Sequence, residues 1–128
     1  RRLWGFFAAH CGGAEGFFAR HFVLNYCPLV FMEESARNLT PDKLPTAAAA
    51  PLFSACDTWL RRVIALYEPE WLVGVGGFAR KKLDLLLAGE PAAPRRATLL
   101  HPSPASPAAN RGWEAAALTQ LREQGVWD

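Results

Sequence analysis

Cysteine is scarce in this sequence, and its few copies form no recognisable pattern. The three cysteines, Cys11, Cys27 and Cys56, are odd in number, and no pair has Cys-x-x-Cys spacing. This argues against a disulfide framework and against a zinc or iron–sulfur site, so we predict reduced thiols in an intracellular protein. Methionine is scarcer still: Met32 is the only one and the chain begins with Arg1, so we expect an amino-terminal truncation.

Long apolar runs and a large net charge are also missing. A membrane-spanning helix needs about 18 consecutive apolar residues, and since no such run occurs we predict no membrane partner. The formal net charge of +2 is too small to establish a nucleic-acid partner. The basic residues do form clusters, which a solvated surface explains equally well. These clusters are Arg1-Arg2, Arg61-Arg62, Arg80-Lys81-Lys82 and Arg95-Arg96.

What is present indicates one globular domain over residues 1–128. Apolar residues make up 51% of the 128 residues, enough to bury a core. Apolar periodicity predicts helices alternating with strands, a pattern typical of an α/β protein whose parallel sheet is covered by helices on both faces. The predicted helices cover about 2–9, 14–20, 51–67, 77–87 and 112–124, and the predicted strands cover 22–26, 71–75 and 97–100.

Each predicted strand ends at a residue that could hold a ligand. Asn25 supplies an amide, Gly76-Gly77 open a helix whose exposed N–H groups can bind an anion, and His101 supplies an imidazole. The carboxyl ends of parallel strands meet at one edge, where α/β proteins bind ligands. These groups together favour a nucleotide, although close packing explains the glycines equally well and His101 alone could be a loop residue without a task.

The loop after His101 carries the strongest motif. The stretch His101–Pro104 is by itself moderately specific for a protein family. Five other stretches occur with it in a fixed order along the chain: Trp4–Phe7, Asn25–Leu29, Arg37–Pro41, Gly74–Gly76 and Asn110–Trp113. Together these stretches resemble the uracil-DNA glycosylase superfamily over nearly all 128 residues. The resemblance implies a three-layer α/β/α fold with a central parallel sheet, truncated at its amino terminus.

The resemblance also implies roles for single residues. Asn25 matches the asparagine whose amide pairs with the edge of a flipped uracil, a pattern that cytosine cannot satisfy. His101 matches the histidine that hydrogen-bonds uracil O2 and stabilises charge on the departing base. Three further groups match residues that contact DNA. Gly76 and Gly77 match a turn that binds a phosphate, and Arg111 keeps a positive charge for phosphate contact. The loop that pinches the DNA backbone and enters the duplex is matched by Pro102, Ser103, Pro104 and Ala105.

Two departures from the family pattern stand out. The water-activating motif Gly-Met-Asn-Pro-Gly and the aromatic residue that stacks on uracil are absent, since the family carries both upstream of the matched region. The only asparagines are Asn25, Asn38 and Asn110, and none lies in such a motif. Ala105 stands where close relatives carry an arginine wedge, and alanine fills a gap in a base stack poorly.

The resemblance implies a monofunctional glycosylase that excises uracil, and oxidised 5-methyluracil derivatives such as 5-hydroxymethyluracil, from single- and double-stranded DNA. It implies a nuclear monomer that initiates base excision repair with no metal or organic cofactor. One alternative is a catalytically dead DNA-binding remnant that keeps Asn25 and His101. Another is a nucleotide-binding α/β domain unrelated to DNA.

Overall fold

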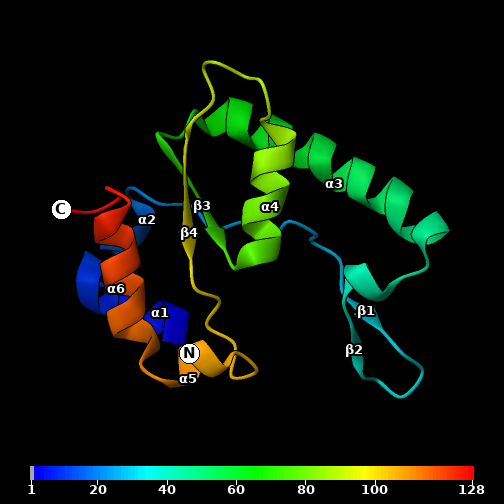
Figure 1. Cartoon of the computed structure of the whole chain (residues 1–128), viewed down its shortest axis with the longest axis horizontal. Helices are drawn as coiled ribbons and strands as arrows, with labels where there is room; N and C mark the ends of the chain where they lie inside the picture. The colour runs from blue at the N-terminus through cyan, green and yellow to red at the C-terminus, as the bar shows by residue number, and fades with distance from the viewer. Residues whose placement is uncertain (1) are drawn as a thin grey trace. The chain divides into compact units, whose positions relative to one another are not determined.

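The computed structural model describes residues 2–128, which form two compact units (Figure 1). The first unit combines the residues up to Val23 with Pro69–Asp128, and the second comprises Leu24–Glu68. Each unit contains one two-stranded sheet, β3 with β4 in the first and β1 with β2 in the second.

A parallel pair of strands forms the centre of the first unit. β3 covers Trp71–Val75 and β4 covers Arg95–Leu99, paired in register from Trp71 with Arg95 to Val75 with Leu99. The helix α4, Gly77–Leu86, connects the two strands. The predicted strand–helix–strand unit is therefore confirmed, with β4 slightly displaced toward the amino terminus from its predicted range.

Successive side chains of β4 face different helices. Thr98 Oγ1 accepts a hydrogen bond from Arg80 Nη1 of α4 at 3.4 Å. Leu99 instead is buried in a cluster with α1, Arg2–Cys11, and α6, Trp113–Glu123. Figure 1 accordingly shows α4 on one side of the two strands and α1 with α6 on the other. The predicted α/β class is confirmed, but the sheets within residues 2–128 have only two strands each, so the wider three-layer sandwich is not confirmed.

The first two helices are separated at Gly12 and Gly13, where the sequence predicts a break. Gly12 and Gly13 have φ of 73° and 86°, in the left-handed region that favours glycine. The helix α1 therefore ends at Cys11, and α2 covers Gly13–Phe18. This turn lets α2 fold back against α1, where the Phe7 and Phe17 rings lie 4.6 Å apart.

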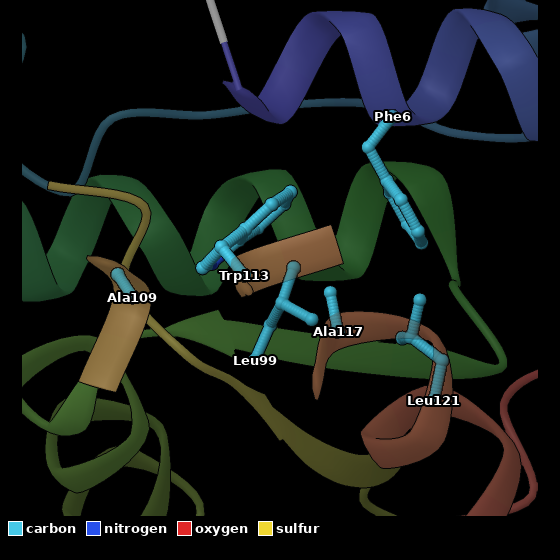
Figure 2. Close-up of a cluster of buried hydrophobic side chains, with 6 residues drawn as sticks. All are labelled: Phe6, Leu99, Ala109, Trp113, Ala117 and Leu121. Atoms are coloured by element: carbon cyan, nitrogen blue, oxygen red, sulfur yellow. The ribbon is translucent and has the colours of Figure 1, made fainter. Parts of the chain in front are cut away.

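Phe6 anchors α1 to the core of the first unit (Figure 2). Its ring stacks on Trp127 with centroids 5.5 Å apart and meets Trp113 edge-on at 5.4 Å. Only 1% of Phe6 is exposed. Figure 2 shows its side chain reaching from α1 toward the buried side chains of α6 and β4. The other buried members of this cluster are Leu99, Ala109, Trp113, Ala117 and Leu121.

Truncating Phe6 should destabilise the first unit strongly. Phe6→Ala removes a buried ring and leaves a cavity that the aromatic neighbours cannot close, so the free energy of unfolding should fall by about 3–5 kcal/mol. Phe18 on α2 is 56% exposed and provides the matched control, because Phe18→Ala should change stability by less than about 1 kcal/mol. Urea unfolding followed by tryptophan fluorescence measures both, and equal losses for the two variants would contradict the assigned core.

The second unit is built on the long helix α3, Thr46–Tyr67. Before it, β1 (Phe31–Met32) pairs antiparallel with β2 (Asn38–Leu39), and the short 3₁₀ helix η1 covers Pro41–Lys43. The sequence predicts that α3 starts at Pro51, which is wrong. The alanines at 47–50 are strong helix formers and extend the helix upstream, so that Pro51 lies inside it. No helix within residues 2–128 is both long and apolar enough to cross a membrane.

The predicted strand at 22–26 does not form. This segment has no regular secondary structure, and Phe22 and Asn25 are exposed. Its composition favours a strand, but a strand needs a partner for its backbone groups, and in the described part of the chain no other strand pairs with it. The prediction that Asn25 lies at the carboxyl end of a strand is therefore wrong.

The proline-rich loop contains a helix that sequence analysis did not predict. The short helix α5 covers Pro107–Asn110, and the Ser106 hydroxyl accepts a hydrogen bond from Ala109 N–H. A serine cap followed by proline at the first helical position is a helix-start signal. The neighbouring prolines concealed this signal, because their alternation favours an irregular loop.

Candidate active site

His101 lies two residues beyond the last residue of β4, Leu99, and is exposed. Its Nδ1 lies 3.2 Å from the backbone N of Ser103. Because that N–H can only donate, Nδ1 is the acceptor, and the neutral imidazole carries its proton on Nε2. The loop thus selects one tautomer of His101, the one whose Nε2–H is available to a ligand.

Gly76 brings the end of β3 against His101. The Gly76 N–H donates to Leu99 O at 2.8 Å, and a Cβ built on Gly76 would lie 3.2 Å from both Cβ and Cδ2 of His101. Gly76 also has a φ of 88°, so a side chain here is disfavoured twice. The structure therefore brings Gly76 and His101 together, as the prediction of one shared edge requires.

The same glycine opens α4 at this edge. Gly76 is the N-cap of α4, no side chain caps the helix, and Gly77, its first residue, is exposed. The first N–H groups of a helix have no partners within it and attract anions. The turn therefore places an anion-attracting helix end beside the imidazole.

The loop from Pro102 to Ser106 is held by its own hydrogen bonds. Ser103 Oγ accepts from Ala105 N–H at 3.2 Å, and Ser103 O accepts from Ser106 N–H at 3.0 Å. Pro104 and Ala105, between these contacts, are exposed. The predicted DNA-contacting residues of this loop thus sit on a stiff turn that begins next to His101.

Two residues without an assigned role tie this loop to α1. Arg2 donates through Nη2 to Asn110 Oδ1 at 2.9 Å and through Nη1 to Pro102 O at 3.4 Å. Asn110 Nδ2 in turn donates to Pro104 O at 2.7 Å. Arg2 and Asn110 lie 108 residues apart, so no local spacing could reveal this contact. Arg111, the predicted phosphate contact, is exposed and follows α5.

A shallow cavity opens beside this network. Its volume is about 300 Å³, and it is lined by Arg2, Ala109, Asn110, Gly112, Trp113, Glu114 and Ala115. The lining combines one guanidinium with the uncapped start of α6, but Glu114 adds a negative charge at the same place. Opposite charges at one rim make this cavity a poor anion site.

Asn25 lies in the second unit, next to a partly buried polar pair. The Tyr26 hydroxyl donates to Asp57 Oδ1 at 2.5 Å and lies 3.2 Å from Phe53 O. Burial, and after it the Asp57 carboxylate, raise the pKa of Tyr26 far above its usual range, so the phenol stays protonated and keeps donating. The pair fixes the residue after Asn25 to α3. The predicted convergence of Asn25 with His101 stays a prediction, because the two residues belong to different units.

No metal centre is formed by the described side chains. Within residues 2–128, no group of three or more histidine, cysteine, aspartate or glutamate side chains could hold a metal ion. Within residues 2–128, Cys11, Cys27 and Cys56 form no disulfide. The chemistry available at the end of β4 is therefore that of an imidazole donor, backbone N–H groups and hydroxyls.

Comparisons with known proteins show which proteins this chain is similar to. No family model matches the chain. Over 125 residues, 98% of the chain, it is 46% identical to the single-strand selective monofunctional uracil-DNA glycosylases of Rattus norvegicus and Mus musculus. It is 43% identical to that of Bos taurus over the same share of the chain. The chain spans 45–46% of the length of these curated relatives.

The predicted resemblance to uracil-DNA glycosylases is confirmed. Within that class, the relatives it matches are the single-strand selective monofunctional uracil-DNA glycosylases, and the similarity extends over almost the whole chain.

Proposed function

We propose that this chain carries the leaving-group and DNA-contacting part of a monofunctional uracil-DNA glycosylase. The observation that carries the proposal is the arrangement at the end of β4. There the Ser103 N–H fixes the tautomer of His101, and Gly76 closes on the imidazole ring. The relatives named as uracil-DNA glycosylases support the same function.

In the proposed reaction His101 stabilises the base as it departs. When the N-glycosidic bond breaks, negative charge develops on the uracil and positive charge on the sugar. The Nε2–H of a neutral His101 donates to uracil O2, where that negative charge gathers. One well-placed donor at a developing charge contributes roughly 3–4 kcal/mol, by analogy with oxyanion holes. Water then attacks the sugar and leaves an abasic site.

Asn25 selects the base in this proposal. Its amide donates to uracil O4 and accepts from uracil N3–H, and cytosine offers the opposite groups at both positions. Only a base that has left the helical stack exposes this edge to a side chain, so the proposal includes base flipping. Uracil and oxidised 5-methyluracil derivatives, such as 5-hydroxymethyluracil, share the edge and are the proposed substrates.

DNA binding is assigned to the exposed turns around His101. Gly76 and Gly77 offer backbone N–H groups to one phosphate, and Arg111 offers a positive charge to another. Pro102, Ser103, Pro104 and Ala105 form the stiff loop that presses on the backbone at the vacated base. With alanine at position 105, the gap in the base stack is filled less well than by a long side chain.

We also propose where the protein acts in the cell and which step of DNA repair it performs. It acts as a monomer in the nucleus on single- and double-stranded DNA, and its abasic product initiates base excision repair. No step of the proposed reaction uses a metal or an organic cofactor, because a side-chain donor and water are sufficient for the hydrolysis.

Residues 1–128 by themselves should release no uracil. They contain no Gly-Met-Asn-Pro-Gly motif to position the attacking water. The test compares this chain with a chimera that adds, upstream of it, the part of the rat relative preceding the matched region. Both are incubated with a single-stranded oligonucleotide that contains one uracil, and free uracil is measured. We expect release by the chimera only.

The other outcomes separate the alternatives. Uracil release by residues 1–128 alone would contradict the assignment of water activation to an upstream motif. A folded chimera that binds abasic DNA without cleaving uracil would indicate a DNA-binding remnant. Binding of free mononucleotides without binding of abasic DNA would indicate an unrelated nucleotide-binding domain.

A further inference from the structure

The residue before His101 is held on both sides of its backbone by side chains of α6. The Leu100 N–H donates to Gln120 Oε1 at 2.7 Å. The Leu100 carbonyl accepts from the indole Nε1–H of Trp113 at 2.6 Å. That carbonyl belongs to the peptide bond that joins Leu100 to His101. The Trp113 contact therefore sets the plane from which the His101 side chain departs.

One helical turn further, at the C-cap of α6, a second glutamine holds the strand itself. Gln124 Oε1 accepts from Thr98 N–H at 2.8 Å, and Gln124 Nε2 donates to Thr98 O, also at 2.8 Å. Gln124 therefore bonds to the outer edge of β4 in the way a neighbouring strand would. This contact lies two residues further from His101 than the contact of Gln120, and it leaves the peptide bond of His101 untouched.

Trp113 connects this arrangement to the core. Its ring is 2% exposed and packs edge-on against Phe6 with centroids 5.4 Å apart. A buried ring cannot move without disturbing its neighbours, so its N–H is a fixed point for the Leu100 carbonyl. Gln120 is partly buried on the same helix and fixes the Leu100 N–H.

We propose that Gln120 and Trp113 are positioning residues for His101, an inference that rests on the proposed role of His101 as the donor to the departing base. Three contacts then define the imidazole: the Leu100 backbone before it, the Ser103 N–H on its Nδ1, and Gly76 against its ring. The first comes from α6, the second from the loop and the third from the turn between β3 and α4. Removing the first leaves the ring able to tilt on the other two.

The reaction is sensitive to such a tilt. A donor stabilises the developing charge only when it lies within about 0.5 Å of its productive position. A displacement of about 1 Å can cost about 100-fold in rate, even when the catalytic group itself is intact. Loss of the Gln120 contact should therefore reduce cleavage and leave DNA binding nearly unchanged, because the phosphate contacts do not use α6.

The experiment compares Gln120→Met, which keeps side-chain length but loses the acceptor, with Gln120→Glu, which retains an acceptor oxygen. Gln124→Met is the matched control at the C-cap of the same helix, and Gln124 is also half-buried. The first readout is the ¹⁵N spectrum of histidine-labelled residues 1–128, with the His101 signals assigned by their loss in His101→Leu. The second is single-turnover cleavage and abasic-DNA binding by the chimera with the upstream part of the rat relative.

In Gln120→Met, the Nδ1 and Nε2 signals of His101 should move toward a mixture of tautomers, and cleavage should fall about 10- to 100-fold. Binding of abasic DNA should change less than about twofold. Gln120→Glu should restore both readouts. Gln124→Met should lower thermal stability and leave the His101 signals and the cleavage rate as in the parent chain. If Gln120→Met does not fold, Gln120→Ala, which also removes the acceptor, takes its place.

Two results would overturn the inference: unchanged His101 signals in folded Gln120→Met, or equal changes in Gln120→Met and Gln124→Met. Neither result would contradict the proposed role of His101 as the donor to the departing base, because that role is tested separately by His101→Leu. If the His101 signals move as expected while Gln120→Met and His101→Leu both cleave at the parent rate, the positioning contact stands and the proposed function fails.

Discussion

Replacing His101 by leucine in the chimera should lower single-turnover uracil cleavage by about 100- to 1000-fold. Leucine keeps much of the side-chain bulk and removes the Nε2–H donor. The charge on the departing base then loses its donor at uracil O2. Binding to DNA with an abasic-site analogue should change much less, because the contacts assigned to Gly76, Gly77, Ser103 and Arg111 go to phosphates.

A histidine with a purely structural role would give the opposite pattern. The melting temperature would fall and activity per folded molecule would be retained. Measuring cleavage rate and melting temperature on one preparation separates the two roles. His101 is exposed and lies outside the buried cluster of the first unit, so we expect a small change in melting temperature. An unchanged cleavage rate in folded His101→Leu would remove His101 from the proposed reaction.

Substitutions of Asn25 should change which base is excised. In the chimera, Asn25→Ala should abolish detectable uracil excision and gain no other base, because it removes both partners of the uracil edge. Asn25→Asp should admit cytosine, since a carboxyl group can accept the cytosine amino group. Excision is measured on matched oligonucleotides that differ only in one base, uracil or cytosine.

The control for Asn25 is binding to the abasic product, which has no base to recognise. Asn25→Ala and the parent chimera should bind it equally. Asn25 is exposed and lies outside regular secondary structure, so its replacement should leave folding intact. Parent-level uracil excision by Asn25→Ala would show that this amide has no part in base selection.

The central part of the first unit could be predicted because its signals are local. Residues 71–75 are an apolar run that ends in glycines, and a helix follows at once. At Gly74, a Cβ would lie 2.6 Å from the backbone N of Arg80, so the glycine inside β3 is required for the close packing of α4 on the strand. Local composition and tertiary packing agree here, and the predicted elements form.

The segment around Asn25 shows where local signals fail. The composition of residues 22–26 favours a strand, but a strand depends on partners far away in the sequence. The contact of Arg2 with Asn110 is also non-local, and so are the glutamine contacts to Thr98 and Leu100. Of the candidate site, the sequence could predict that His101 ends a strand beside Gly76. It could not predict the α6 side chains that hold the backbone there.

The separation of Phe6 from its partners has a consequence for synthesis on the ribosome. Phe6 lies in α1, which begins at Arg2, and its partner Trp113 follows Asn110 closely in the sequence. Translation proceeds at about 5–20 residues per second, so the 108 residues that separate Arg2 from Asn110 take roughly 5–20 s to synthesise. During that interval β3, α4 and β4 can assemble from neighbouring residues, whereas the apolar face of α1 has no α6 to cover it. A nascent chain that stalls before Trp113 therefore displays Phe6 and Phe7 to other molecules. Chaperone binding should concentrate on α1 in such chains.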